Sequence, residues 1–291
     1  MRINNNLMAM NANRALGINN TGMSKSLEKL SSGLRINRAG DDAAGLSISE
    51  KMRAQIRGLN MASKNAQDGI SLIQTAEGAL DEAHAILQRM RELAVQAAND
   101  TNEEIDRQAL QNEVDQLLDE LDRIANDTQF NNKTLLSGSL ALSADGKTGG
   151  LVFHIGANAD QNIRIGINSM NTTKIGFSGS DGSLTAISTL KGSGITTQAK
   201  ANNAITTING AINMVSAERS KLGAIQNRLE HTIKNLDNAA ENLQAAESRI
   251  RDVDMAKEMM EFTKQTILQQ ASTAMLAQAN QVPQTVLQLL R

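Results

Sequence analysis

Few residues in this sequence have the types and spacing that chemistry requires. The three histidines, His84, His154 and His231, are far apart in the chain, and none belongs to an H-E-x-x-H pair or another spaced metal cluster. There is no cysteine, which removes disulfides, thiolate metal sites and a cysteine nucleophile together. His84 and His231 lie beside apolar positions of helical spacing, so we predict half-buried helix-face histidines rather than metal ligands.

Asp41 and Asp42 form an adjacent pair of carboxylates among Gly33, Gly40 and Gly45. Without further ligands at fixed spacing, we predict that they form a turn and cap the next helix rather than bind a metal. No phosphate-binding glycine loop follows a strand, and the basic residues near the N-terminus lack aromatic neighbours that could stack on bases. The sequence therefore predicts no catalytic residue, no metal, no cofactor and no nucleic-acid partner, and we do not expect an enzyme.

The most regular pattern is an apolar seam in residues 199–254. An apolar residue occupies every seventh position, and a second series three residues on, interrupted by Glu218 and Thr232, completes an a/d heptad pattern. The first series consists of Ala201, Ile208, Val215, Leu222, Leu229, Leu236, Leu243 and Ile250. At about 1.5 Å per residue this helix is roughly 80 Å long, so it must lie along other long helices.

A second seam of the same regularity runs through residues 52–97. Most positions three residues after its heptad positions are small, which allows helix axes to approach closely, so we expect this helix to nest beside the one at 199–254. Its heptad positions are Met52, Leu59, Ala66, Ile73, Leu80, Leu87 and Ala94. A turn at 99–102 predicts that a third helix, at 103–127, runs back antiparallel. Residues 100–127 carry ten acids against two arginines, which we interpret as a solvated helix face.

The two ends of the chain have weaker helical patterns. Residues 3–34 are rich in asparagine, a poor helix former, so we expect them to be disordered in the free subunit and ordered only by packing. From Gln265 to Leu290 no residue is charged and seven are glutamine, which suits a packed assembly interior in contact with water. The apolar stripe of this last helix consists of Leu268, Met275, Val282 and Leu289.

The middle of the chain changes from helical to strand periodicity. Residues 151–155 and 163–167 alternate, and 156–162 read as the turn of a β-hairpin. Residues 168–198 have five glycines, no sustained period and no obvious apolar face, so we expect a surface excursion of low order. Together these patterns predict a mainly α fold: a long antiparallel coiled-coil-like helical bundle rod with a small β-hairpin region and paired chain termini.

The composition argues against a globular protein with an aromatic core and against a membrane-spanning protein. With four phenylalanines, no tyrosine and no tryptophan, the chain must bury Leu, Ile, Met and Ala along extended seams rather than in an aromatic core. No run of about 20 apolar residues could span a bilayer, and residues 1–20 lack the apolar core of a signal peptide. We therefore expect no membrane insertion, and export would need a specialised apparatus.

Several long runs resemble a known family over nearly the whole chain. They are NNN at 4–6, LSSGLRIN at 30–37, GDDAAGL at 40–46, QRMRELAVQ at 88–96, LGAIQNRL at 222–229 and VLQLLR at 286–291. Each run is long and unusual, and together they resemble bacterial flagellin.

The resemblance implies a structural subunit that polymerises into the flagellar filament for motility, exported unfolded by the flagellar type III apparatus without a cleaved signal and located outside the cell. It implies inner-tube terminal helices at 1–40 and 255–291, an outer-tube helical rod with the hairpin at 44–170 and 198–254, and a short variable surface excursion at 171–197. The implied partners are further copies of the chain and the export chaperone, cap and hook-junction proteins of the flagellum. Large outer domains, present in many relatives, are missing from the middle of this chain.

The resemblance also implies two sets of site residues. Recognition by Toll-like receptor 5 would involve Gln88, Arg89, Arg91, Glu92, Leu93, Val95 and Glu113. The assembly seams would include Leu80, Leu87, Leu229, Leu236, Leu268, Met275 and Leu289.

Three alternative functions remain at this point. The hook-filament junction protein, or another axial flagellar protein, would share the same helical pattern. A chemoreceptor-like signalling hairpin would also have long alanine-rich heptads, but it would need a membrane anchor. An enzyme carried on a filament would need a catalytic insert, for which the middle segment is too short.

Overall fold

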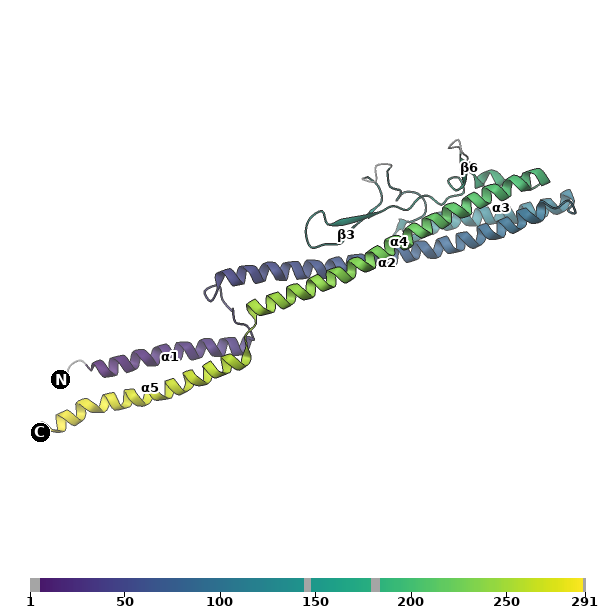
Figure 1. Cartoon of the computed structure of the whole chain (residues 1–291). Helices are drawn as coiled ribbons and strands as arrows, with labels where there is room; N and C mark the ends of the chain where they lie inside the picture. Colours follow the sequence, from purple (N-terminus) through teal and green to yellow (C-terminus); the bar gives the residue numbers. More distant parts are fainter. Residues whose placement is uncertain (1–5, 144–147, 179–183, 290–291) are drawn as a thin grey trace. The chain divides into compact units, whose positions relative to one another are not determined.

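The structure is a computed structural model and describes residues 6–143, 148–178 and 184–289, with the side chains of the last helix described as far as 281. The chain divides into two units. The terminal unit comprises Met1–Ile56 and Glu241–Arg291, and the central unit comprises Arg57–Ala240. Two long helices contribute residues to both units (Figure 1).

The described chain is mainly helical, which confirms the predicted fold class. Its long helices are α1 (Leu7–Ser32), α2 (Ala43–Ala97), α3 (Glu104–Asp127), α4 (Gln198–Arg251) and α5 (Met255–Leu289). The strands β1 (Gln129–Phe130), β2 (Lys133–Thr134), β3 (Leu151–His154), β4 (Asn162–Ile165), β5 (Gly176–Ser178) and β6 (Leu184–Ala186) and the 3-10 helix η1 (Ile187–Leu190) lie between α3 and α4. The helix bounds agree with the predicted segments to within a few residues, except that α2 begins nine residues before the seam predicted at 52–97.

The connection from α1 to α2 is built by short polar contacts. Gly33 ends α1 in the left-handed conformation, at φ 72°, which glycine adopts without strain. The Asp41 carboxylate accepts hydrogen bonds from the backbone N–H groups of Asn37 and Arg38, at 3.2 and 3.0 Å, and these bonds lower its pKa. Asp42 accepts from the N–H of Gly45 at 2.8 Å and so caps the start of α2. The predicted turn and capping roles of the two aspartates are confirmed.

The core of the central unit is formed by the predicted heptad seams. Leu80 and Leu87 on α2, and Leu222 and Leu229 on α4, are fully buried in one cluster with apolar residues of α3. The small positions of α2 are buried as well, as predicted, and they are Ala62, Ala76, Ala83 and Ala97. A salt bridge of 2.9 Å between Arg219 on α4 and Asp81 on α2 lies beside this core.

The predicted β-hairpin is present. β3 pairs antiparallel with β4 in a register that places Leu151 opposite Ile165 and Phe153 opposite Ile163. Ile163 and Ile165 are buried in the core of the central unit. A Cβ atom at Gly69 of α2 would lie 3.3 Å from the ring of Phe153, so this glycine allows the hairpin to lie close against the helix.

The expectation that residues 168–198 lack an apolar face is wrong. Ile175, Ile187, Leu190 and Ile195 are all buried in the core of the central unit. Ile187 and Leu190 lie at the two ends of η1, whereas Ile175 and Ile195 lie in irregular segments on either side, so no period of two or 3.6 marks the four residues.

The acidic face of α3 accounts for the order of this segment. The N–H of Thr172 donates to Asp122 at 2.9 Å, and the N–H of Gly192 donates to Asp115 at 2.9 Å. Buried Gln111 donates to the carbonyl of Leu190 and accepts from the N–H of Ile195, both at 2.8 Å. Some of the acidic residues of α3, which were predicted to form a solvated helix face, therefore bind the backbone of residues 168–198.

Candidate functional site

The helices at the two ends of the chain pack along each other in the terminal unit (Figure 1). The side-chain amide of Asn6 donates to the carbonyl of Ala279 at 2.7 Å, and that of Asn19 donates to the hydroxyl of Ser272 at 3.0 Å. Lys29 lies 3.9 Å from the carboxylate of Glu258. The predicted pairing of the chain ends is confirmed, and two asparagines of the Asn-rich segment supply contacts between the helices.

This helix pair has almost no core of its own. Ser26 is the one buried residue of α1, and Ala279 is the one buried residue in the described part of α5. Many large apolar residues of the two helices are instead exposed, and we call them the terminal apolar set: Leu7, Met8, Met10, Ile18, Leu27, Met255, Met259, Met260, Ile267, Leu268 and Met275. An accumulation of exposed apolar residues on this scale is typical of a surface that binds another protein.

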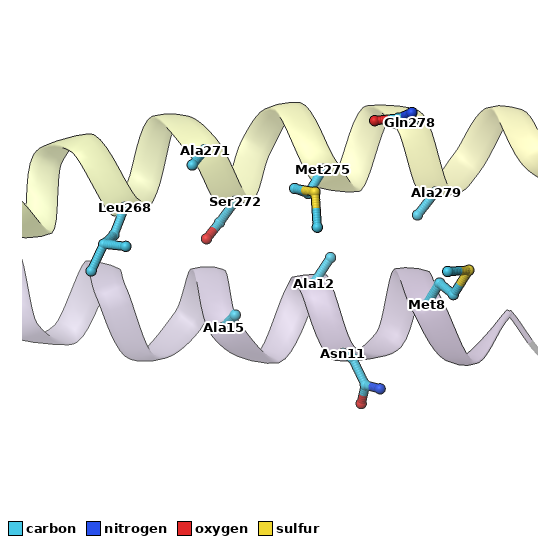
Figure 2. A pocket seen from close by; sticks show the side chains of 10 residues that line it. All are labelled: Met8, Asn11, Ala12, Ala15, Leu268, Ala271, Ser272, Met275, Gln278 and Ala279. Atoms are coloured by element: carbon cyan, nitrogen blue, oxygen red, sulfur yellow. The ribbon is translucent and has the colours of Figure 1, made fainter.

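A groove of about 660 Å³ lies between the two helices. Figure 2 shows Leu268 and Met275 of α5 pointing toward α1, opposite Ala15 and Ala12. Because these alanines are short, the space between the helices is not filled by the chain's own side chains. The full lining consists of Met8, Asn11, Ala12, Ala15, Leu268, Ala271, Ser272, Met275, Gln278 and Ala279.

The lining residues of α1 were not singled out in the sequence, although they carry a signal. Positions 8, 11, 12 and 15 follow the i, i+3, i+4, i+7 spacing of one helix face. Ala9, Leu16, Met23 and Leu30 form a separate seven-residue series in the same helix. Alanine and asparagine contribute little to a hydrophobic stripe, so this face could be found only by treating small residues as apolar.

The structure divides the residues expected in assembly seams into two groups. Leu80, Leu87, Leu229 and Leu236 are buried within the central unit, where they serve the subunit's own core. Leu268 and Met275 are 39% and 64% exposed in the terminal groove. The side chain of Leu289 lies outside the described residues.

The residues expected in receptor recognition lie on α2, except Glu113 on α3. Gln88, Arg91, Glu92 and Val95 line an open groove of about 580 Å³, together with Gln96 and with Ile212 of α4. Leu93 is only 1% exposed and belongs to the core, so its side chain is not part of this surface.

Arg89 joins the two helices that carry these residues. Its guanidinium lies 2.9 Å from the carboxylate of Glu113 and 3.1 Å from that of Glu92. The hydrogen bond to Glu113 is the main reason why the pKa of Arg89 is raised above its ordinary value. The ion pairs are exposed, so solvent screens them and they contribute little to stability.

The described residues contain no group of three or more histidine, aspartate or glutamate side chains that could hold a metal. His84 is half-buried, as predicted, with its Nε2 atom 2.8 Å from the amide of Gln88. His231 is exposed, so the prediction of a half-buried histidine is wrong there. No helix in the described part of the chain combines the length and apolar character needed to cross a bilayer. The arrangement that the structure does offer is a large apolar surface on paired helices.

Comparison with known proteins agrees with the two-ended organisation of the chain. The bacterial flagellin N-terminal helical region matches residues 3–141, and the bacterial flagellin C-terminal helical region matches residues 205–290.

The full-length relatives are similar over the whole chain. The chain is 58% identical to the flagellin of Bacillus subtilis over 308 aligned residues and 60% identical to the flagellin of Halalkalibacterium halodurans over 292, with all of both chains covered in each pair. Its fold is similar to that of flagellar hook associated protein-3 from Legionella pneumophila, at 16% identity and a TM-score of 0.52, over 69% of this chain and 98% of that one. The chain belongs to the bacterial flagellin family.

Proposed function

We propose that this chain is the structural subunit that polymerises into the bacterial flagellar filament, and that the terminal apolar set forms the contacts between subunits. The observation that carries the proposal is the exposure of eleven large apolar residues on a helix pair that has almost no core of its own. Family membership indicates which assembly would cover them.

The energetics favour burial of this surface in an assembly. Burying one Met, Leu or Ile side chain stabilises by about 1.5–3 kcal/mol. Several such side chains per subunit, repeated along a polymer, can offset the entropy lost when a subunit is immobilised. No charged residue lies between Gln265 and Leu290, so the end of α5 can be buried without desolvating a charged side chain.

Seeded polymerisation of purified chain tests the proposal. Met275→Glu should block assembly, because a carboxylate without a partner in a packed contact costs several kcal/mol, whereas in the free subunit it stays in water. Met61→Glu is the matched control, because Met61 is similarly exposed, at 55%, but lies on α2 in the central unit. Sedimentation measures polymer, and circular dichroism of the free subunit establishes that both variants are folded.

Leu268→Lys places a charge of opposite sign in the same groove and should block assembly as well. Normal filaments from both Met275→Glu and Leu268→Lys would show that the groove stays open to solvent after assembly. The proposal would then be wrong about the contact surface.

The remaining roles follow from family membership. We propose that the chain is non-enzymatic, leaves the cell unfolded through the type III apparatus without a cleaved signal, and acts in the extracellular filament. Its partners would be further copies of itself and the export chaperone, cap and hook-junction proteins. In the proposed division of the subunit, 1–40 and 255–291 form the inner tube, and 44–170 and 198–254 form the outer tube. Residues 171–197, which connect the two outer-tube segments, contribute to the outer surface.

A role at the junction between hook and filament is the second candidate. The fold similarity to flagellar hook associated protein-3 is compatible with it, but at 16% identity this similarity concerns the fold alone. Full-length identity of 58–60% to flagellins favours the filament subunit. Growth of long filaments from the purified chain alone would separate the two, since a junction protein forms a short, bounded layer.

The exposed groove on α2 and α4 supports a further proposal, that Toll-like receptor 5 binds the face carrying Gln88, Arg89, Arg91, Glu92 and Val95, with Glu113 beside it. A receptor-reporter assay on the free subunit tests it. Arg89→Ala should weaken the signal at least about tenfold if Arg89 contributes about 1.4 kcal/mol or more to binding. Arg228→Ala, at an exposed position of α4 away from this groove, is the control and should signal normally.

A further inference from the structure

The methionines of this chain are distributed unevenly between surface and core. The sequence has thirteen methionines and no cysteine, tyrosine or tryptophan, so methionine is its most readily oxidised side chain. Met90 and Met170 are buried in the core of the central unit. Among the described residues, the methionines that are about half exposed or more are Met8, Met10, Met61, Met255, Met259, Met260 and Met275. All of these except Met61 lie on α1 or α5.

Two of the exposed methionines line the same groove. Met8 of α1 is 69% exposed and Met275 of α5 is 64% exposed, and both border the space between the paired helices (Figure 2). An oxidant in solution can therefore reach both sulfur atoms in the free subunit. Under the proposed function, the same side chains become buried when the subunit enters the filament.

Oxidation would change the chemistry of this groove. Hydrogen peroxide transfers one oxygen atom to the thioether: the O–O bond breaks, an S–O bond forms, the sulfur is oxidised and water leaves. The product, methionine sulfoxide, is polar and accepts hydrogen bonds.

The groove offers little to satisfy a sulfoxide oxygen. Figure 2 shows Asn11 pointing away from the opposite helix, and the neighbours of Met275 across the groove are alanines. The hydroxyl of Ser272 accepts a hydrogen bond from Asn19 and keeps one O–H to donate, which can serve at most one of two sulfoxides. A sulfoxide at Met8 or Met275 is thus well solvated in the free subunit and poorly satisfied once neighbouring subunits cover it.

We propose that Met8 and Met275 form an oxidation site that controls assembly: peroxide converts them to sulfoxides in the free subunit and excludes that subunit from the polymer, whereas incorporation protects them. This inference rests on the proposed function, since it requires assembly to cover the groove. Methionine sulfoxide reductases of both stereospecificities, supplied with a thiol reductant, would restore assembly competence.

A partition experiment on the unaltered chain tests this directly. Free subunits are partly oxidised with hydrogen peroxide, freed of oxidant and polymerised on unoxidised seeds, and the sulfoxide fraction at each methionine is measured by peptide mass spectrometry in pellet and supernatant. Sulfoxide at Met8 and Met275 should be at least about tenfold rarer in the pellet than in the supernatant. Sulfoxide at Met61 should be equal in the two fractions, and Met90 and Met170 should remain unmodified.

Two further measurements use the same assay. Peroxide added after polymerisation should leave Met8 and Met275 largely unmodified while Met61 reacts. In the variant M8L/M275L, peroxide should reduce polymer formation clearly less than in the unaltered chain, because the methionines that remain in the terminal apolar set lie outside the groove. The M61L control should lose polymer as the unaltered chain does, and an equal loss in M8L/M275L would contradict the proposal.

The outcomes separate the two proposals. Untreated chain that does not polymerise on seeds would overturn the proposed function and this inference together. Untreated chain that polymerises, with Met8 and Met275 sulfoxides equally distributed between pellet and supernatant, would overturn the oxidation site alone. Failure of the reductases to restore assembly would also overturn it, because damage other than methionine oxidation would then be responsible.

Discussion

Individual side chains of the central unit owe their positions to the heptad seams. Leu80 on α2 and Leu229 on α4 were placed in the seams by seven-residue spacing, and both are fully buried in the structure. Glu218, which interrupts the second series of α4, is also buried, and its carboxylate accepts from the backbone N–H of Asn168 at 3.2 Å and from its side-chain amide at 2.9 Å. The seam thus tolerates a charged residue where the loop before β5 supplies donors.

Truncation of a seam residue gives a direct prediction. Leu80→Ala should destabilise the central unit by about 2–5 kcal/mol, because it leaves a cavity in a packed core. Leu236→Ala should fall at the low end of that range, since Leu236 is 8% exposed. Chemical denaturation monitored by circular dichroism measures both, with Met61→Ala on the exposed face of α2 as the control. Losses within experimental error for both leucine variants would mean that the seams have been misassigned.

The roles of residues that follow a regular spacing or a local turn pattern could be predicted from the sequence. The roles of residues whose partners lie far away in the chain could not. Asp41 and Asp42 were assigned to a turn and a cap because those roles are local in sequence. Gln111, which binds the backbone at Leu190 and Ile195, makes contacts some eighty residues away along the chain. Nothing in the neighbourhood of Gln111 in the sequence indicates those partners, since they are set by how the segment folds back.

The same limit applies to whole elements. The long helices were predictable because each repeats its period many times, and the β3–β4 hairpin was predictable because two alternating strands flank one turn. The segment from residue 168 to the start of α4 has no period, yet it inserts Ile175, Ile187 and Leu190 into the core. Gly210 of α4 leaves room for the backbone of β5, where a Cβ atom would meet the carbonyl oxygen of Gly176 at 2.6 Å. The structure of the segment before α4 therefore depends on its packing against other elements rather than on a pattern in its own sequence.

Deletion of residues 171–195 should consequently destabilise the chain. Each buried isoleucine or leucine contributes about 1.5–3 kcal/mol, so removing four of them should cost more than about 4 kcal/mol. A solvent-exposed loop would cost less than about 1 kcal/mol, because closure entropy depends only weakly on loop length. Denaturant titration distinguishes the two, and Lys191→Ala, which removes an exposed ion pair with Asp119, should barely move the midpoint.

The paired helices α1 and α5 contrast with residues 168–198: they have a helical pattern in the sequence but bury almost no residues. Because α1 buries only Ser26, we predict that α1 and α5 are weakly protected in the dilute subunit and become strongly protected in filaments. Hydrogen exchange of residues 7–32 and 255–281 measures this, with the α2 segment at 70–97 as a reference that should be protected in both states. Strong protection of the terminal helices in dilute subunit would contradict it.

At the scale of the whole molecule, the two units have different roles: one forms a stable core and the other presents an apolar surface. The central unit buries its own seams and needs no partner for its core. In the terminal unit, the paired helices α1 and α5 expose their large apolar residues to solvent. The two helices are joined by a few polar contacts. A chain organised in this way can remain a folded subunit through one unit and assemble through the other.

Electron cryomicroscopy of filaments grown from the purified chain tests this account most directly. The account predicts long filaments in which Met8, Ile18 and Met275 contact neighbouring subunits, while Leu80 and Leu229 remain within their own subunit. Filaments in which the groove between α1 and α5 faces bulk solvent would contradict it.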